Sequence, residues 1–364
     1  MTKTSQLQPT AHPSSSARRW WCEAFVSIII ACRNEEKFIA GCLDSVLAND
    51  YPKERLEILV VDGRSEDRTR AIVRKYEQRH RCVRLLDNPK RITPSAFNIG
   101  VRHARGEVIM ILGSHAVYPR DYVSKCVRYL YEFDADNVGG VLQTRPRKSD
   151  AFGQAVTRAL SHRFGVGNAR FRTGTRAPEW VDTVFGGCYR REVFQRVGLF
   201  NEELVFSADM EFNRRLKRAG GRILLVPEIH ATYFARQDFK SFLKHNLRNG
   251  FWVTYPFKFV RHMPISWRHL VPLAFVGSLL LSTLLAPFVK PLLFAALFIL
   301  LSYVSANLYV SWRIALAEKR HGLVWLLPVV FASIHFSYGL ASLWGWLKVV
   351  ASRRYWRRFL PKQP

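Results

Sequence analysis

The chain has 364 residues, of which 48% are hydrophobic, and its formal net charge is +27. This length is enough for one large domain and a smaller part, and the charge indicates anionic partners such as phospholipid headgroups or phosphate ligands. The sequence has no nucleic-acid recognition motif, so we expect no nucleic-acid partner. Its six cysteines are scattered without a CxxC pair, which argues against a zinc site and a disulfide framework.

The N-terminal residues 1–24 are polar and rich in Ser and Pro, and they lack the apolar core of a signal peptide. We expect a disordered tail there. After it, short apolar runs typical of buried parallel strands alternate with stretches of helical spacing. The strands are expected within "FVSIIIACRNEE", "LEILVVDG", "CVRLLDN" and "EVIMILG". This alternation predicts an α/β domain with a doubly wound parallel sheet over residues 25–235.

Ligands of such sheets bind beyond the carboxyl ends of the strands. Three predicted strand ends carry polar or small residues there, at 31–35, 62–65 and 113–115. We therefore expect these segments to line one crevice.

Residues 144–176 form a strongly basic stretch with few acids. Two interpretations stay open: a solvated or disordered loop, and a cationic shelf for a phosphorylated acceptor or for lipid headgroups. Further along, Gly186 and Gly187 permit close approach of a ligand to the backbone. Asp209 and Glu211 stand at the start of a predicted helix that ends before Gly220.

Residues 236–269 mix aromatic and basic side chains at helical spacing, which is typical of helices in the membrane interface. Three apolar segments follow within residues 270–350, at about 270–289, 291–312 and 323–349, each long enough to span a membrane. Three spans would place the basic tail 351–364 outside, against the positive-inside tendency. A third segment that is re-entrant or interfacial would return the tail to the cytosol, and both topologies stay open.

Several spaced motifs resemble the inverting glycosyltransferase family 2, which has a GT-A fold. They cover roughly residues 25–255 and include "VSIIIACRNEEKFIAGCLDSVL", "EILVVDGRSEDRT", "NPKRITPSAFNIGVRHARGE" and "FGGCYRREVFQRVGLFNEEL". Within that family the chain is most similar to succinoglycan-type membrane glucosyltransferases of bacterial exopolysaccharide assembly. The resemblance implies a Rossmann-like nucleotide-diphospho-sugar transferase domain, followed by interfacial and transmembrane helices.

The same resemblance implies roles for individual residues. It places the donor nucleotide, expected to be UDP, at Ala31, Arg33, Glu35, Asp62 and Ser114, with Asp62 contacting the uracil. For inverting transfer it implies an Asp at a helix start that deprotonates the acceptor hydroxyl, and Asp209 matches that position. In the family a Glu usually precedes this Asp, whereas Ala208 stands here.

Four further residues are expected near the acceptor or the diphosphate, namely Gly187, Glu211, Arg248 and Trp252. Arg248 and Trp252 lie in "HNLRNGFW", where relatives carry a Gln/Arg-rich motif that ends in Trp, and an interfacial anchor is the alternative role. Glu211 has a structural role as its alternative.

The stretch "GSHA" departs from the family pattern of two acids separated by one residue. Gly113 stands at the position of the first acid and His115 at the second. A neutral imidazole ligates Mn²⁺ or similar ions, so His115 is a candidate ligand for a divalent cation, Mn²⁺ or Mg²⁺. Transfer without a metal, with basic residues at the diphosphate, and loss of activity are the alternatives.

The sequence therefore predicts a membrane-associated inverting hexosyltransferase of the bacterial inner membrane, with its catalytic domain facing the cytoplasm. Its expected partners are a nucleotide-diphospho-sugar, with glucose as the candidate sugar, a polyprenyl-pyrophosphate-linked saccharide and membrane phospholipids. Transfer to polyprenyl phosphate and a catalytically degenerate membrane scaffold are the two rival functions.

Overall fold

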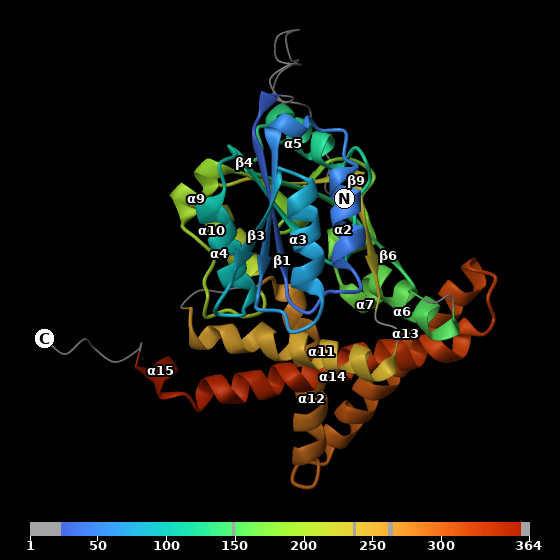
Figure 1. Cartoon of the computed structure of the whole chain (residues 1–364). Helices are drawn as coiled ribbons and strands as arrows, with labels where there is room; N and C mark the ends of the chain where they lie inside the picture. The colour runs from blue at the N-terminus through green and yellow to red at the C-terminus, as the bar shows by residue number, and fades with distance from the viewer. Residues whose placement is uncertain (1–22, 148–149, 236–237, 261–264, 358–364) are drawn as a thin grey trace, which may run out of the picture. The chain divides into compact units, whose positions relative to one another are not determined.

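A computed structural model describes residues 23–147, 150–235, 238–260 and 265–357. Most of the expected tail 1–24 and the end of the basic tail 351–364 lie outside these ranges. The chain divides into two compact units (Figure 1). The first unit comprises Met1–Gln143 and Arg170–Phe234, and the second comprises Thr144–Ala169 and Ala235–Pro364. The sequence predicts one continuous domain over residues 25–235. In the structure, residues 144–169 of that range group with the C-terminal helices instead.

One half of the sheet in the first unit is parallel, with the strand order β3-β2-β1-β4. These strands are β1 (Val26–Cys32), β2 (Leu56–Asp62), β3 (Val83–Asp87) and β4 (Val108–Gly113). The helices between them are α2 (Ile39–Leu47), α3 (Thr69–Arg79) and α4 (Thr93–His103). The apolar side chains of the central strands are almost completely buried, because helices cover both faces of such a sheet. The predicted alternation of strands and helices is confirmed here.

The other half of the sheet is antiparallel, so the sheet is mixed rather than parallel throughout. β8 (Phe185–Arg190) pairs with β4, and the order continues through β6 (Asn137–Arg145), β9 (Ile223–Phe234) and β5 (Ala116–Val117). The short strand β7 (Glu179–Trp180) pairs with β9. The helices of this half are α5 (Tyr122–Glu132), α8 (Arg170–Thr173), α9 (Arg191–Val197) and α10 (Ala208–Arg218).

The second unit is helical. The basic stretch contributes α6 (Ala151–Ser161) and α7 (Arg163–Val166), so most of it is not an irregular loop. The remaining elements are α11 (Phe239–Thr254), η2 (Tyr255–Lys258), η3 (Trp267–Leu270), α12 (Val271–Leu285), α13 (Pro291–Ala317), α14 (Leu323–Val350) and α15 (Arg353–Trp356).

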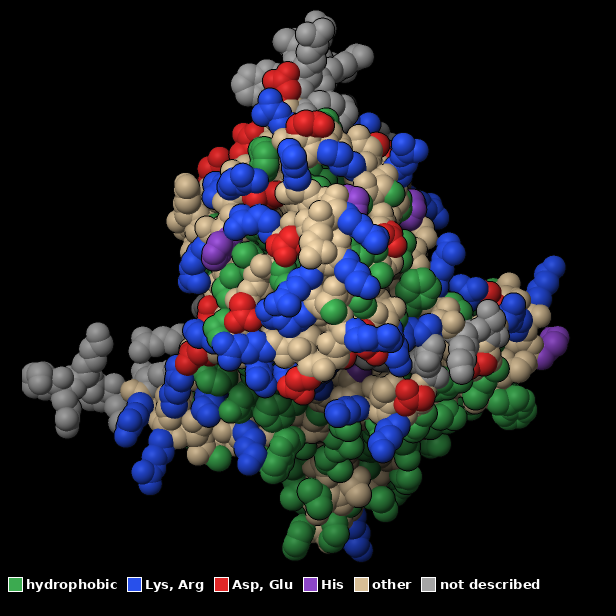
Figure 2. Space-filling view, viewed as in Figure 1, with side chains coloured by type: hydrophobic (Ala, Val, Ile, Leu, Met, Phe, Trp, Pro, Cys, Tyr) green, Lys and Arg blue, Asp and Glu red, His purple; other side chains and the backbone are tan. Residues whose placement is uncertain are grey.

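Three helical segments are long and apolar enough to cross a membrane: Trp267–Leu285, Pro291–Ala317 and Leu323–Val350. Exposed apolar side chains gather on the first two segments (Figure 2). On the second of them, Phe294 and Phe298 are 72% and 73% exposed. α14 is far more enclosed, because α11, α12 and α13 all pack against it. Pro328 lies inside α14 without ending it, and the Asn307 amide donates a hydrogen bond to the Pro328 carbonyl at 3.0 Å.

Small residues let α11 and α14 pack backbone to backbone (Figure 1). A Cβ atom added at Gly250 would lie 2.3 Å from the carbonyl oxygen of Tyr338. One added at Gly345 would lie 2.6 Å from the carbonyl oxygen of Phe251. The Ser342 hydroxyl donates to the Gly250 carbonyl at 2.9 Å, so polar contacts reinforce this close approach.

Candidate functional site

The register of the parallel strands brings the predicted crevice segments together. Ala31 lies opposite Gly113 in the pairing of β1 with β4, and Cys32 lies opposite Asp62 in the pairing of β1 with β2. All three strands therefore end at the same edge of the sheet, with β1 in the middle. The segments 31–35, 62–65 and 113–115 each begin in the last residues of one of these strands.

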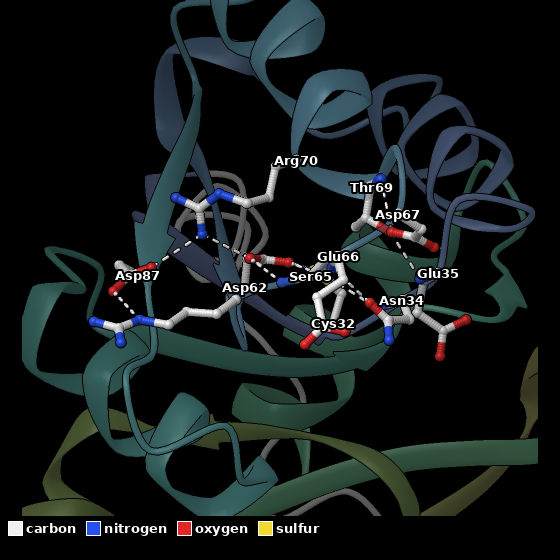
Figure 3. A network of polar contacts seen from close by, with 11 residues as sticks. Cys32, Asn34, Glu35, Asp62, Ser65, Glu66, Asp67, Thr69, Arg70 and Asp87 are labelled. Carbon is white, nitrogen blue, oxygen red and sulfur yellow. Dashed lines mark hydrogen bonds and ion pairs between the residues drawn. The ribbon is translucent and has the colours of Figure 1, made fainter.

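Asp62 is completely buried, and both of its carboxylate oxygens accept hydrogen bonds from the chain (Figure 3). The backbone N–H and the hydroxyl of Ser65 donate to it at 3.0 and 2.5 Å, and the Arg70 guanidinium donates at 2.7 Å. The thiol of Cys32 lies 3.8 Å from Oδ1. Arg70 also reaches Asp87 at 3.0 Å, and the hydrogen bond to Asp62 is the main cause of its raised pKa.

Further hydrogen bonds tie the loop after β1 to the loop after β2 (Figure 3). The Asn34 backbone N–H donates to the Ser65 hydroxyl at 2.9 Å, and the Asn34 side-chain carbonyl accepts from the Glu66 N–H at 2.9 Å. The Glu35 N–H donates to the Thr69 hydroxyl at 2.8 Å. The two predicted nucleotide-binding loops are thus one connected structure.

Backbone in the left-handed region recurs around this edge, at Asn34 (φ 55°), Arg64 (φ 55°) and Arg91 (φ 58°). Such conformations disfavour side chains with a Cβ and often mark functional loops. The predicted nucleotide-binding residue Arg33 is 42% exposed at its side chain and lies 3.8 Å from Glu66, which Arg91 also approaches at 3.6 Å. Two cations therefore share one exposed carboxylate at the rim.

The third segment places His115 against Glu35. The Nδ1 atom of His115 lies 3.0 Å from Oε1 of Glu35, and the Ser114 hydroxyl lies 3.4 Å from the same nitrogen. Ser114 is buried, whereas the His115 side chain is 42% exposed. Gly113 is fixed by Tyr118, whose hydroxyl accepts from the Gly113 N–H at 2.8 Å and donates to its carbonyl at 3.1 Å.

A metal ion bound by several protein ligands does not fit this segment. Among the described residues, no group of three or more His, Cys, Asp and Glu side chains could hold a metal ion. The arrangement fits a single ligand, because a metal-binding His commonly donates its other ring N–H to a carboxylate, as His115 can donate to Glu35. Nε2 of His115 is then the ring atom that would coordinate an ion.

Two glycines of β8 lie at the same end of the sheet. A Cβ added at Gly186 (φ 71°) would lie 2.9 Å from the carbonyl oxygen of Ile111, and one at Gly187 (φ 126°) would lie 2.4 Å from the ring of Tyr189. Only glycine fits both positions without rearrangement. The predicted ligand-approach residue Gly187 therefore has a packing reason of its own, namely the Tyr189 ring.

Asp209 is the second residue of α10 and follows Ser207, whose backbone is left-handed (φ 66°). The residue is exposed to solvent, yet protein atoms surround its carboxyl group, and this desolvation raises its pKa above the ordinary 3.8. Its charge is felt by Tyr189, whose pKa is raised by burial first and by Asp209 second. Asp209 thus lies near the Tyr189 ring that covers Gly187, which links it to the crevice.

Glu211 has a different environment from Asp209. It is 2% exposed, and its Oε1 atom accepts a hydrogen bond from Arg215 at 2.8 Å. Arg215 in turn donates to the backbone carbonyls of Val197 and Leu199. These contacts hold the segment after α9 against α10, which favours the structural role for Glu211.

Arg248 and Trp252 belong to the second unit. They lie on α11, and with Leu340 and Trp344 of α14 they line an open, mainly apolar pocket of about 420 Å³. A cation at the edge of an apolar groove suits an amphiphilic ligand.

Sequence reasoning missed two residues beside the third segment, Arg172 and Tyr233. The Tyr233 ring lies 6.4 Å from the His115 ring, edge on, and the Arg172 guanidinium lies 5.6 Å from the Tyr233 ring. Arg172 is one of many arginines in the basic stretch, and the sequence alone does not distinguish it. Tyr233 comes near His115 only through the pairing of β5 with β9.

Comparisons with known proteins identify the family to which part of this chain is similar. Residues 27–198 match the model of the family Glycosyl transferase family 2. The succinoglycan biosynthesis protein ExoA of Rhizobium meliloti is 29% identical over 240 residues, which is 61% of this chain and 72% of that protein. A dolichyl N-acetyl-alpha-D-glucosaminyl phosphate 3-beta-D-2,3-diacetamido-2,3-dideoxy-beta-D-glucuronosyltransferase of Methanococcus voltae is 28% identical over 234 residues, covering 62% of this chain and 72% of that protein.

A solved structure shares the fold. The mannosyltransferase PcManGT from Pyrobaculum calidifontis, determined with GDP-Man and Mn²⁺, superposes with a TM-score of 0.56 at 21% sequence identity and covers 88% of both chains. The likeness agrees with a GT-A-like sheet domain followed by C-terminal helices. The chain is therefore a glycosyltransferase that carries a glycosyl transferase family 2 domain.

Proposed function

We propose that the protein transfers a sugar from a nucleotide-diphospho-sugar, with inversion, to a hydroxyl of a polyprenyl-pyrophosphate-linked saccharide at a membrane surface. The observation that carries this proposal is Asp209 at the start of α10, because desolvation raises the pKa of its carboxyl group. A general base works best when its pKa lies closer to the working pH than that of an ordinary carboxylate.

The reaction is a single displacement. Asp209 accepts the proton of the acceptor hydroxyl, and the hydroxyl oxygen forms a bond to the anomeric carbon of the sugar. The bond from that carbon to the nucleotide diphosphate breaks on the opposite face, and the diphosphate leaves with the electron pair. Inversion at the anomeric carbon follows from this geometry. The step needs cationic or hydrogen-bonding groups at the leaving diphosphate.

We assign the nucleotide, proposed to be uridine, to the wall formed by the loops at 31–35 and 62–65. Asp62 has all its oxygens engaged with Ser65, Arg70 and Cys32, which supports a positioning role rather than direct contact with the base. Ala31 lies near the end of the central strand β1, Arg33 and Glu35 follow that strand, and Ser114 follows β4 beside it. The nucleotide then meets a surface that Asp62 holds in place.

A divalent cation would be held on the protein side by Nε2 of His115, with Glu35 orienting the imidazole through Nδ1. When bound, such an ion supplies positive charge to the diphosphate of the donor. The presence of Mn²⁺ in the PcManGT structure supports this assignment.

The acceptor side draws its support from the relatives and from the membrane helices. The name of the Methanococcus voltae relative specifies a dolichyl-linked sugar phosphate, and that of the Rhizobium meliloti relative specifies succinoglycan biosynthesis. We extend a lipid-linked saccharide acceptor to this chain on that basis. Arg248 and Trp252, at an apolar pocket on α11, suit the phosphate and the first isoprene units of such a lipid.

We propose that α12 and α13 cross the bacterial inner membrane as a hairpin, while α14 lies with α11 in the cytoplasmic interface. The packing of α14 along α11 and the exposed apolar faces of α12 and α13 support this arrangement. It keeps the basic residues Arg353 and Arg354 on the cytoplasmic side, in line with the positive-inside tendency. The catalytic domain then also faces the cytoplasm.

The test is a panel of UDP- and GDP-linked sugars offered to membrane-extracted protein with two acceptors, a polyprenyl-pyrophosphate-linked saccharide and polyprenyl phosphate. We expect the wild type to transfer sugar from a UDP-linked donor to the first acceptor. Asp209→Asn should lose most of this turnover. Product on polyprenyl phosphate alone would assign the protein to the simpler lipid-phosphate transferases. No turnover of any donor by the wild type, with nucleotide still bound, would favour a catalytically degenerate scaffold.

A further inference from the structure

The feature that carries a further inference is Arg172, a cation held between aromatic rings in the first unit. Its guanidinium carbon lies 5.6 Å from the centre of the Phe171 ring and 5.6 Å from the centre of the Tyr233 ring. Phe171 and Tyr233 both pack against the main hydrophobic core of the sheet. The cation therefore lies against two rings that are partly buried at the edge of the core.

The Nη1 atom of Arg172 is buried and has no hydrogen-bond partner among the described residues. Burial also lowers the pKa of this guanidinium, although an arginine stays protonated at neutral pH. A buried donor without an acceptor costs about 1–3 kcal/mol, and more when the group is charged. A protein retains such a group where a ligand supplies the missing acceptor.

The neighbouring arginine of the same short helix has a different environment. Arg170 forms an ion pair with Glu179, since its Nε atom lies 3.3 Å from Oε1 of that residue. Arg172 forms no ion pair within the described part of the chain. Of the two arginines of α8, Arg170 is therefore paired with a carboxylate, whereas Arg172 has a buried N–H donor without an acceptor.

Arg172 lies beside the edge where the donor is expected. The ring of Tyr233 contacts Arg172, and it also contacts His115, whose partner is Glu35. Tyr233 lies opposite Ala116 in the pairing of β5 with β9, so it is placed directly next to the loop that ends β4. The Tyr233 ring therefore separates the unsatisfied cation from His115, which stands where the family pattern has its second acid.

We propose that Arg172 binds a phosphate oxyanion at this edge and so contributes protein-borne positive charge to the diphosphate of the donor. The inference rests on the proposed function and deepens it. A guanidinium suits this role because its planar fork donates two parallel N–H bonds to phosphate oxygens. The phosphate of the lipid acceptor has the same chemistry, and the two sources are separated by the experiment.

The role differs from that of His115. His115 offers a metal ligand, whereas Arg172 needs no metal to bind phosphate. Nucleotide binding should then persist in a chelator, carried by Arg172, even where sugar transfer requires the ion. During the displacement the phosphate oxygens keep their hydrogen bonds to Arg172 while negative charge builds on them, which stabilises the leaving group.

The experiment measures binding to the full-length protein in detergent with excess EDTA. The probes are UDP, uridine as a control without phosphate, and vesicles that contain polyprenyl phosphate. We expect Arg172→Gln to weaken UDP binding about tenfold or more, with uridine binding unchanged and with Arg172→Lys between the two. Arg176→Gln is the matched control, since it removes one exposed charge from the same segment.

Thermal unfolding distinguishes a phosphate-binding role of Arg172 from a purely structural one. Without a probe, Arg172→Gln should unfold at the same or a higher temperature than the wild type, because an unsatisfied buried charge is removed. With UDP, the wild type should gain more in unfolding temperature than the variant. A variant that unfolds at a much lower temperature without a probe would assign Arg172 to the fold and overturn the inference.

The remaining outcomes are equally decisive. A loss confined to polyprenyl phosphate would keep Arg172 as a phosphate-binding residue but would overturn its assignment to the donor. Equal affinity of wild type and Arg172→Gln for both phosphate probes would overturn the inference but leave the proposed function unaffected. A wild-type protein that binds neither UDP nor polyprenyl phosphate would overturn the inference and the proposed function together.

Discussion

Nδ1 of His115 lies 3.0 Å from Oε1 of Glu35, so the loop after the fourth strand and the loop after the first strand are joined by one polar contact. The contact fixes the orientation of an exposed imidazole. It also gives Glu35 a partner within the protein, in addition to the nucleotide contact that the family resemblance implies for this residue. The contact leads to the first prediction.

Glu35→Gln should lower the affinity for Mn²⁺ in the presence of UDP by about 10–100-fold, because the carboxylate that orients the ligating imidazole is lost. His115→Ala should remove the Mn²⁺ effect altogether. Titration of Mn²⁺ into the UDP complex, followed by electron paramagnetic resonance, measures both. Glu36→Gln is the control, since Glu36 pairs with Arg68 instead. If His115→Ala bound Mn²⁺ as tightly as the wild type, the ligand role would be wrong.

Gly113→Asp should restore a carboxylate beside His115 without loss of the fold. A Cβ at this position would lie 3.6 Å from Cζ of Phe185 and 3.8 Å from Oη of Tyr118, which is ordinary contact. We expect an unfolding temperature close to that of the wild type and a higher Mn²⁺ affinity in the same titration. Gly186→Asp is the contrasting variant and should be destabilised, because its φ is 71° and its Cβ would lie 2.9 Å from a backbone oxygen. An unchanged Mn²⁺ affinity in Gly113→Asp would count against a cation at this edge.

The raised pKa of Asp209 predicts the pH dependence of transfer. The base must be ionised, so the rate should fall as the pH drops through a pKa that lies above the ordinary 3.8. Asp209→Asn should lower the rate by about 10²–10⁴-fold and remove this acid limb. The measurement is kcat/KM against pH. An acid limb that stays in the residual activity of Asp209→Asn would assign it to another group.

The same shift has a consequence for stability with a definite sign. A carboxyl group whose pKa is raised by folding favours the folded state when protonated, and that contribution is lost as the pH rises through the folded pKa. At neutral pH the charged Asp209 therefore destabilises the fold, and Asp209→Asn should unfold at a higher temperature. The difference should shrink at a pH below 3.8, where both forms are neutral.

The close packing of α11 on α14 predicts a large effect of one methyl group. Gly250→Ala should destabilise the protein by about 1–3 kcal/mol, since the new Cβ would lie 2.3 Å from the Tyr338 carbonyl oxygen and the helices must separate. Gly277→Ala, in α12, is the matched control because nothing lies within 4 Å of its added Cβ. Thermal unfolding in detergent micelles compares the two. Equal unfolding temperatures would contradict the packing described for α11 and α14.

The proposed topology predicts where single cysteines react with a membrane-impermeant maleimide. Phe288→Cys, at the tip of the α12–α13 hairpin, should react from the periplasmic side of spheroplasts. Ser352→Cys, after α14, should react only once the membrane is opened. Wild-type protein gives the background from native thiols. Reaction of both variants in intact spheroplasts would favour three full spans.

The parallel half of the sheet could be predicted from the sequence because its central strands are continuous apolar runs. In β1, for example, Ile28, Ile29 and Ile30 are all fully buried, as a strand covered on both faces requires. The convergence of the three strand ends followed from topology alone. The antiparallel half was less accessible, since β8 lies between β4 and β6 in the sheet and its pairing joins residues far apart in the chain.

At the site, residue types were predicted better than partners. The positions of Asp62, His115 and Asp209 at strand and helix ends could be read from the sequence, but the contacts of Asp62 with Ser65 and Arg70 could not. Those contacts depend on the backbone conformation of the loops and on the direction of the side chains. The hydrophobic pattern of a strand predicts neither. Arg172 shows the same limit, because its significance comes from the Tyr233 ring, which the fold brings beside it.

The hydrogen bonds that converge on Asp62 have an energetic consequence for recognition. A flexible loop must lose conformational entropy when a ligand orders it, and that loss weakens binding. Here Ser65, Arg70 and Asn34 are already held by the chain itself, so the loops around the proposed donor site are ordered before a nucleotide arrives. The buried carboxylate therefore acts as a preorganising centre, and its contribution to affinity comes from the freedom it removes in advance.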